Sequence, residues 1–160
     1  MIKSILKGLV LSSVAVALVA APAAAQIGWS LGGGVSMPST DGAENGWHAL
    51  GAATFALPAL PIGVRADVMY TAFDGASILG VNADAKWNIL PGPLSPYAIG
   101  GLSWGSTSIE ALDESQSDFG YNFGAGLDFG ISKLSFFAEY RWVTLGDGDA
   151  ISPLTVGLRF

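Results

Sequence analysis

Two charged residues stand in the apolar segment "FFAEYRW", where Glu139 and Arg141 alternate with aromatic and small side chains. Charges in such surroundings are costly unless paired. They belong either to an active site in an apolar pocket or to a strand whose two faces meet different environments. Similar charges recur in other alternating segments, and the full set is Arg65, Asp67, Asp84, Lys86, Asp128, Glu139, Arg141 and Arg159. Four of these are basic and four acidic, so the set can neutralise itself by ion pairing.

Hydrolytic or acyl-transfer chemistry would need a nucleophile and a base, and His48 is the single histidine of the chain. Its candidate partners are Asp41, Glu44, Ser39, Ser106 and Ser108. A catalytic triad is defined by geometry, and no sequence spacing links these residues into one. We therefore expect no enzymatic activity and no cofactor, with His48 hydrogen-bonded or solvated at the rim of the fold.

Two acidic segments, "DESQSD" (113–118) and "GDGD" (146–149), carry oxygen ligands of the kind that Ca²⁺ prefers. Neither has the spacing of an EF-hand loop, so solvated acidic loops are the expectation and no metal site is predicted. The chain has no cysteine, which removes disulfides and thiolate sites from consideration.

The composition is unusual for a soluble protein. Charged residues make up 12% of the 160 residues, about half the usual ~25%, while hydrophobic residues reach 51%. A disordered chain would be less apolar and more charged. The formal net charge of −6 makes nucleic acid an improbable partner.

Residues 1–25 have the features of a secretory signal peptide. Lys3 and Lys7 precede the apolar stretch "GLVLSSVAVALVA", and small residues at Ala23 and Ala25 precede an expected cleavage before Gln26. A permanent anchor is the alternative, but the stretch is short for a helix that must span with ~20 residues. We expect export by the general secretory route and one mature domain, 26–160.

The mature chain alternates apolar and polar residues with period two, interrupted by Gly, Pro, Asp and Ser clusters. This pattern predicts eight strands, at 26–37, 47–57, 63–72, 78–90, 96–106, 118–131, 134–145 and 152–160. Two classes of connection alternate along the chain: short turns at 58–63, 91–96 and 131–133, and mostly longer acidic loops at 38–46, 73–77, 106–117 and 146–150. Together they predict an all-β, eight-stranded, up-and-down antiparallel barrel with both termini at the short-turn end.

The alternation alone leaves open which face points inward. A soluble lipocalin-like barrel or sandwich buries its apolar face, whereas an outer-membrane barrel turns that face to lipid. The polar face here consists mainly of Gly, Ser, Asn and Thr with balanced charges, which suits a narrow lumen better than a water-exposed sheet. The transmembrane barrel is therefore the favoured interpretation, with the eight strand charges as a lumen network.

Aromatic residues gather near strand ends, as in the interfacial girdles of membrane barrels. The girdle candidates are Trp29, Trp47, Tyr70, Trp87, Tyr97, Tyr121, Tyr140 and Trp142. The fifth strand is irregular, because Leu102 and Trp104 are out of phase with Tyr97 and Ile99. A β-bulge between these pairs is the expected explanation.

The segments "LPIGVRADVMY", "SPYAIGGLSWG", "FFAEYRW" and "PLTVGLRF" resemble small eight-stranded outer-membrane barrels. This group includes the transmembrane domain of outer-membrane protein A, the opacity-type surface antigens and outer membrane protein beta-barrel domains. The resemblance implies that the final residues Leu154, Val156, Leu158 and Phe160 form the signal for the barrel assembly machinery. The family signal usually has two aromatics at alternate positions, and Leu158 replaces the first.

The resemblance also implies an integral outer-membrane location and a monomer surrounded by lipid and lipopolysaccharide, assembled with the help of periplasmic chaperones. A structural or surface-interaction role, in envelope integrity or adhesion, is the expected function. A narrow small-solute channel is the alternative, because an eight-stranded barrel is just wide enough for its own side chains to fill. A lipid-modifying enzyme at the rim is a third and weaker hypothesis.

Overall fold

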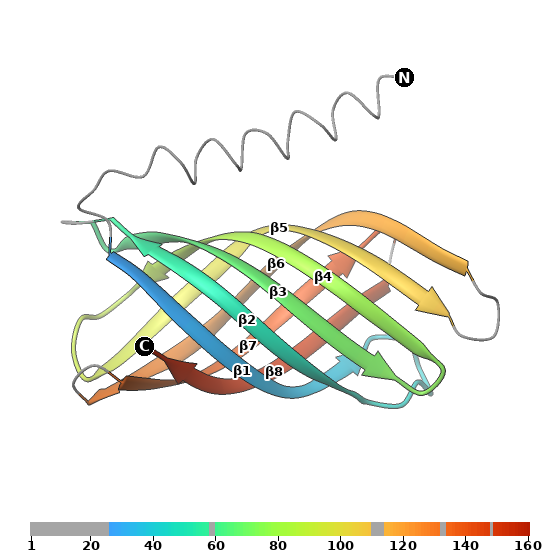
Figure 1. Ribbon diagram of the computed structural model, residues 1–160, viewed down its shortest axis with the longest axis horizontal. Helices are drawn as coiled ribbons and strands as arrows, with labels where there is room; N and C mark the ends of the chain where they lie inside the picture. The colour runs from blue at the N-terminus through green and yellow to red at the C-terminus, as the bar shows by residue number, and fades with distance from the viewer. Residues whose placement is uncertain (1–25, 58–59, 110–113, 132–133, 148) are drawn as a thin grey trace, which may run out of the picture.

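The computed structural model describes residues 26–57, 60–109, 114–131, 134–147 and 149–160. Eight strands follow one another along the chain (Figure 1): β1 Gln26–Pro38, β2 Gly46–Ala56, β3 Ile62–Phe73, β4 Ala76–Asn88, β5 Leu94–Ile109, β6 Glu114–Ile131, β7 Leu134–Leu145 and β8 Asp149–Arg159. The expected signal peptide lies outside the described residues. Within them, no helix is long and apolar enough to cross a membrane.

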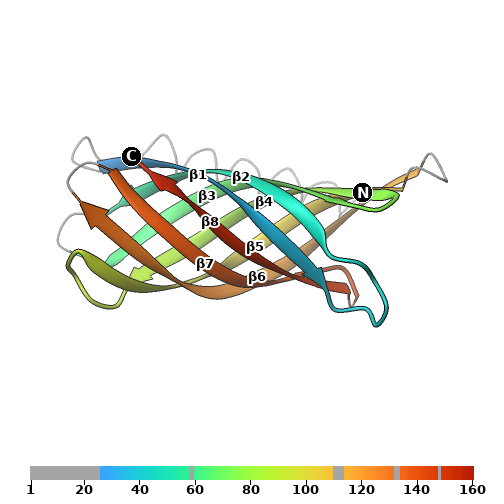
Figure 2. The same ribbon diagram turned by 90° about the horizontal axis from the view of Figure 1, so that it is seen from below.

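Every strand pairs antiparallel with the next, and β1 pairs with β8, so the sheet closes into a barrel. The strands cross the barrel obliquely in both views (Figures 1 and 2). Two backbone hydrogen bonds join Trp29 and Phe160, so the start of β1 and the end of β8 share one end of the barrel. We call this the turn end, and the opposite end, where the connections after β1, β3, β5 and β7 lie, the loop end. The predicted fold class is confirmed.

Two hairpins at the loop end are tighter than the sequence suggested. The expected loop 106–117 is mostly strand, because β5 continues to Ile109 and β6 already begins at Glu114. Asp74 and Gly75 alone connect β3 to β4, and Gly75 has a φ of +73°. An Asp-Gly pair suits a two-residue hairpin, since glycine adopts this left-handed conformation without steric cost.

Side chains alternate between the interior and the outer surface along each strand. In β3, Arg65 and Asp67 are buried, whereas Val64 and Val68 are exposed. The outer surface is mostly apolar, so the large exposed side chains of all eight strands form a hydrophobic wall. A wall of this kind is stable against lipid and would be unfavourable against water.

The fifth strand has no bulge, and this prediction was wrong. β5 pairs with β6 in unbroken register over its whole length. Tyr97 and Ile99 point into the barrel, at 1% and 4% exposed, while Leu102 lies exposed on the outside. The apparent change of phase arose because two apolar side chains of β5 belong to the interior.

The interior also contains an apolar layer on the loop-end side of the charges. Leu50, Met69, Val143 and Ile151 are buried there, packed with partly buried Ile78 and other apolar residues. These side chains come from five strands, β2, β3, β4, β7 and β8. We call the four buried residues with Ile78 the apolar plug.

Candidate functional site in the barrel interior

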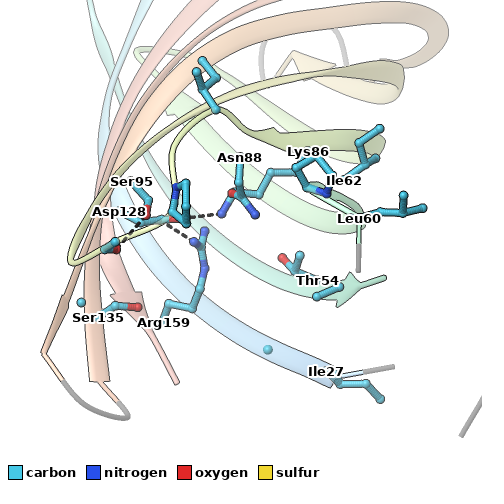
Figure 3. A pocket seen from close by; sticks show the side chains of 18 of the residues that line it. Ile27, Thr54, Leu60, Ile62, Lys86, Asn88, Ser95, Asp128, Ser135 and Arg159 are labelled. Carbon is cyan, nitrogen blue, oxygen red and sulfur yellow. Dashed lines mark hydrogen bonds and ion pairs between the residues drawn. The ribbon is translucent and has the colours of Figure 1, made fainter. Parts of the chain in front are cut away.

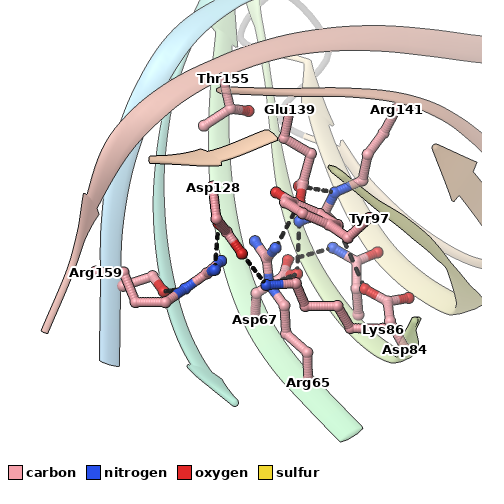
Figure 4. Close-up of polar contacts among 12 residues, drawn as sticks. Arg65, Asp67, Asp84, Lys86, Tyr97, Asp128, Glu139, Arg141, Thr155 and Arg159 are labelled. Atoms are coloured by element: carbon pink, nitrogen blue, oxygen red, sulfur yellow. Dashed lines mark hydrogen bonds and ion pairs between the residues drawn. The ribbon is translucent and has the colours of Figure 1, made fainter. Parts of the chain in front are cut away.

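Five of the eight predicted lumen charges meet in the middle of the barrel, and we call them the central cluster: Arg65, Asp67, Asp84, Glu139 and Arg141 (Figure 4). Arg141 donates through Nε to Glu139 Oε1 at 2.6 Å and through Nη2 to Asp67 Oδ2 at 2.7 Å. Arg65 Nη1 reaches the second oxygen of Glu139 at 2.6 Å. All five are at most 3% exposed, so the cluster is shielded from water and its charges depend on one another.

Neutral polar side chains surround the acids of this cluster. Asn82 donates to Asp67 at 2.7 Å and accepts a hydrogen bond of 2.6 Å from Ser103. Asn122 donates to Asp84 at 2.7 Å. These contacts occupy carboxylate oxygens that the two arginines do not satisfy, which lowers the cost of burying three acids beside two bases.

The remaining three charges form a second group nearer the turn end, the turn-end cluster. Lys86 Nζ lies 2.5 Å from one oxygen of Asp128, and Arg159 pairs with the other oxygen. The side chain of Lys86 is 5% exposed, and those of Arg159 and Asp128 are 14% and 15% exposed. They line a cavity of about 700 Å³ together with residues of the turn end such as Leu60 and Ile62 (Figure 3). Water therefore reaches this cluster.

Two aromatic rings lie between the clusters. Tyr97 donates its hydroxyl to Glu139 at 2.6 Å, and Lys86 Nζ stands 4.1 Å from the centre of its ring. The Phe137 ring centre lies 5.9 Å from the guanidinium carbon of Arg65 and 5.3 Å from that of Arg159. Cations over aromatic faces gain favourable electrostatic energy. The rings thus contact both clusters and separate them.

This arrangement corrects the assignment of Tyr97 to the aromatic girdle. Its hydroxyl needs a partner when buried, and Glu139 supplies it. The neighbouring strands make room with glycine: Gly126 pairs with Tyr97 and Gly157 with Phe137, and a Cβ would come within 2.4 Å of the Tyr97 ring at Gly126 and within 2.6 Å of Phe137 at Gly157. The signal that sequence reasoning missed is a glycine directly opposite each of these aromatic residues on the adjacent strand.

The other proposed girdle residues point outward. All seven have large exposed fractions on the outer surface: Trp29, Trp47, Tyr70, Trp87, Tyr121, Tyr140 and Trp142. Trp47 and Tyr70 contact each other across β2 and β3, with ring centres 5.8 Å apart. The residues proposed as the assembly signal share the outer face of the final strand, where all four are exposed: Leu154, Val156, Leu158 and Phe160.

His48 lies inside the barrel wall and not at the solvated rim, being 2% exposed. Its Nδ1 lies 3.0 Å from Ser36 Oγ, and its Nε2 lies 2.8 Å from Thr155 Oγ1. None of its five sequence candidates is among these partners. Both ring nitrogens are occupied by hydroxyls, and no carboxylate orients the ring, so the described contacts do not form an acid–base–nucleophile triad.

No group of three or more histidine, aspartate or glutamate side chains is placed to hold a metal ion in the part of the chain that the structure describes. The polar residues that sequence reasoning did not single out are hydrogen-bond partners on the inner face, such as Ser30, whose Oγ accepts from Arg159 Nε at 3.1 Å. Their alternation in phase with the lumen charges is the signal that identifies them.

The model of the family described as "Outer membrane protein beta-barrel domain" matches residues 9–160. No curated protein sequence matches the chain.

Solved structures share the fold at low sequence identity. Neisserial surface protein A superposes with a TM-score of 0.75 at 16% identity, covering 84% of this chain and 97% of that one. Ail, the attachment invasion locus protein of Yersinia pestis, gives 0.60 at 20% identity, with 84% and 97% covered. The N-terminal β-barrel domain of Pseudomonas aeruginosa OprF gives 0.63 at 18%, with 85% and 99% covered.

These likenesses show the barrel fold, and the family match places the protein in the outer membrane. Its span leaves only the first eight residues of the chain unmatched. The chain belongs to the family of outer membrane protein beta-barrel domains.

Proposed function

We propose that the protein is a non-enzymatic structural or surface-interaction barrel, acting in envelope integrity or adhesion rather than in solute transport. The observation that carries this proposal is that two sets of buried side chains occupy the lumen. The central cluster ties charges from β3, β4 and β7 together, and the apolar plug lies on its loop-end side. The proposal includes export by the general secretory route and contact with lipid and lipopolysaccharide.

Closure at two levels opposes the flow of small solutes for different physical reasons. An ion crossing the central cluster would have to separate buried pairs, which costs several kcal/mol when one partner is left alone. It would then meet the apolar plug, where Leu50, Met69 and Val143 are each 3% exposed and offer no hydrogen bonds. We therefore expect the cavity of the turn-end cluster to be a dead end for small solutes.

The surroundings of His48 support a structural role for that residue. The ring connects β1, β2 and β8 through Ser36 and Thr155, at the seam where the first and last strands meet. A buried histidine between two hydroxyls fixes strand positions without access to a substrate. Ail, which shares the barrel fold, is the attachment invasion locus protein of Yersinia pestis, and a surface role for the present barrel is consistent with that likeness.

Conductance measurements test closure directly. Purified protein refolded into planar lipid bilayers should stay electrically silent, whereas a channel would produce discrete conductance steps. A variant that weakens both levels, Arg141→Ala with Leu50→Ala and Met69→Ala, is the matched positive control when it refolds, since it removes one base of the central cluster together with two plug side chains. Steps in the wild type as large as those in this variant would contradict the proposal.

A deletion strain tests the positive half of the proposal. Loss of the protein should raise sensitivity to detergent or reduce attachment to surfaces, and the wild-type gene should restore both. The His48→Ala variant should restore them equally well when it folds, because the proposal assigns the ring no chemistry. An activity that this substitution abolishes in correctly folded protein would favour the enzyme hypothesis instead.

A further inference from the structure

A second hollow, separate from the charged lumen, is lined by residues of the loop end. The loop end of the barrel is on the right of Figure 1. It has a volume of about 490 Å³, within the ~300–1,000 Å³ typical of ligand pockets. Its apolar lining includes Pro38, Phe73, Ile78, Ala150 and Ile151. Because Ile78 and Ile151 also belong to the apolar plug, the outer surface of the plug is the floor of this hollow.

Two carboxylates stand at the rim of the hollow. Glu44 belongs to the connection between β1 and β2, and Asp74 to the turn between β3 and β4; both are exposed. The connection carrying Glu44 is held in place locally, since Ala43 N donates to Thr40 O at 3.2 Å and Ser39 N donates to Ala150 O at 2.9 Å. The hollow thus combines an apolar floor with two negative charges supplied by neighbouring hairpins.

The charge of the whole loop end has one sign. The sequence places nine acids in or beside the loop-end connections: Asp41, Glu44, Asp74, Glu110, Asp113, Glu114, Asp118, Asp147 and Asp149. Those connections contain no Lys or Arg. The basic residues of the mature chain are the four lumen cations and Lys133, which lies between β6 and β7 in the sequence and outside the described residues. A field of one sign attracts ligands of the opposite sign and repels anions.

We propose that the loop-end hollow binds cationic peptides that carry apolar side chains, with an apolar side chain seated on the plug and basic groups paired with Glu44 and Asp74. This inference rests on the proposed surface-interaction role and names the chemistry of the partner. Charge complementarity selects basic over acidic partners, and the apolar floor selects amphipathic over uniformly polar ones.

Both features are needed for the selection. Exposed carboxylates alone attract any cation, and salt screens that attraction over ~10 Å at 0.1 M. The apolar floor adds a contribution that salt does not weaken, because burying apolar area is favoured independently of charge. Binding should therefore fall with salt and level off at a residual affinity that depends on the apolar side chains of the peptide.

The test uses the full protein in nanodiscs of neutral phosphatidylcholine, with empty nanodiscs subtracted. The probe is a short fluorescein-labelled peptide of Lys and Leu, followed by fluorescence anisotropy. A peptide of equal length with Ser in place of Leu, and another with Glu in place of Lys, should bind at least about tenfold more weakly. Ala43→Trp, which fills the hollow from its exposed edge, should weaken the binding of the Lys/Leu peptide and leave that of the other two peptides unchanged.

A matched pair of charge variants separates the hollow from the general field. Glu44→Gln with Asp74→Asn should weaken binding of the Lys/Leu peptide about tenfold, because both lost charges lie at the rim. Asp41→Asn with Asp147→Asn removes the same charge from exposed loop-end positions that do not line the hollow, and should change affinity only about twofold.

Equal losses in the two double variants, or equal binding of the Lys/Ser and Lys/Leu peptides, would overturn the proposal in favour of unspecific attraction. Absence of binding would also overturn it. That result would leave the closed lumen untouched, since closure is read from bilayer conductance, whereas conductance steps in wild-type protein that still binds the peptide would overturn the proposed function alone.

Discussion

The central cluster and the turn-end cluster consist of the same kinds of side chain in different surroundings. Arg141 and Glu139 pair at 2.6 Å with almost no exposure, whereas Arg159 and Asp128 pair beside an open cavity at 14% and 15% exposed. The distance between partners therefore says little about what a pair contributes. What differs is the environment in which a charged side chain is left when its partner is removed. In the central cluster it stays buried in the protein, whereas in the turn-end cluster it lies beside an open cavity.

In this narrow barrel, charged side chains occupy much of the lumen. In the middle, where water is excluded, two arginines and three acids hold one another and fix the positions of β3, β4 and β7. At the turn end, Arg159 and Asp128 are partly exposed and all three charges line an open cavity. Burying these charges therefore costs less, and their pairing contributes less to the arrangement of the strands. The rings of Tyr97 and Phe137 mark the boundary between the two regimes.

The largest expected effect is the loss of Arg141. Arg141→Ala leaves Asp67 and Glu139 buried with one fewer base, and we expect a loss of about 3–5 kcal/mol in the free energy of unfolding, as for a broken buried pair. Urea unfolding of the refolded barrel in lipid vesicles, with the heat-dependent gel shift as a second readout, measures the change. An unchanged gel-shift midpoint would contradict the buried network.

A smaller effect is expected from Tyr97→Phe, which removes only the hydroxyl that donates to Glu139. A hydrogen bond to a charged group contributes about 1.5–3 kcal/mol, so the free energy of unfolding should fall by about that amount. Tyr70→Phe is the matched control, since Tyr70 is exposed on the outer surface and should change stability little. Equal changes in the free energy of unfolding for the two substitutions would contradict the buried hydrogen bond and indicate that Tyr97 belongs to the aromatic girdle.

The smallest effect is expected from Arg159→Ala, the counterpart of Arg141→Ala in the hydrated cluster. Water and Lys86 remain to solvate Asp128, so the loss should be about 1 kcal/mol and should shrink as salt is raised. The same urea titration at two salt concentrations measures it. If Arg159→Ala costs as much as Arg141→Ala, hydration does not distinguish the clusters.

Most of the fold follows from period-two alternation because each strand of a membrane barrel has a polar and an apolar face. The charges made the inner face identifiable, since Arg65, Asp67 and Glu139 mark their strands independently of loop lengths. Strand ends were less predictable, because β5 and β6 extend into the segment 106–117 that was expected to be a loop. The polar residues of this segment still pair across the two strands, so the hairpin continues.

Tyr97 was misassigned because an aromatic residue near a strand end fits two environments, the lipid interface and a lumen with a free acceptor. His48 was expected at the rim because it lies near the start of the second strand, and its contacts were missed because Ser36 and Thr155 are 12 and 107 residues away. Closing β1 against β8 brings those hydroxyls to the ring, and no local pattern contains that information.

The sequence by itself determined the eight antiparallel strands, the face of each that is polar, and a set of four basic and four acidic residues able to neutralise itself. These properties are local or additive, so alternation and counting reveal them. Only the tertiary structure decided how the charges divide into a dry and a hydrated cluster, which rings separate them, and where the apolar plug lies. The physical reason is that burial depends on which strands face each other across the lumen, and closure of the barrel sets those distances.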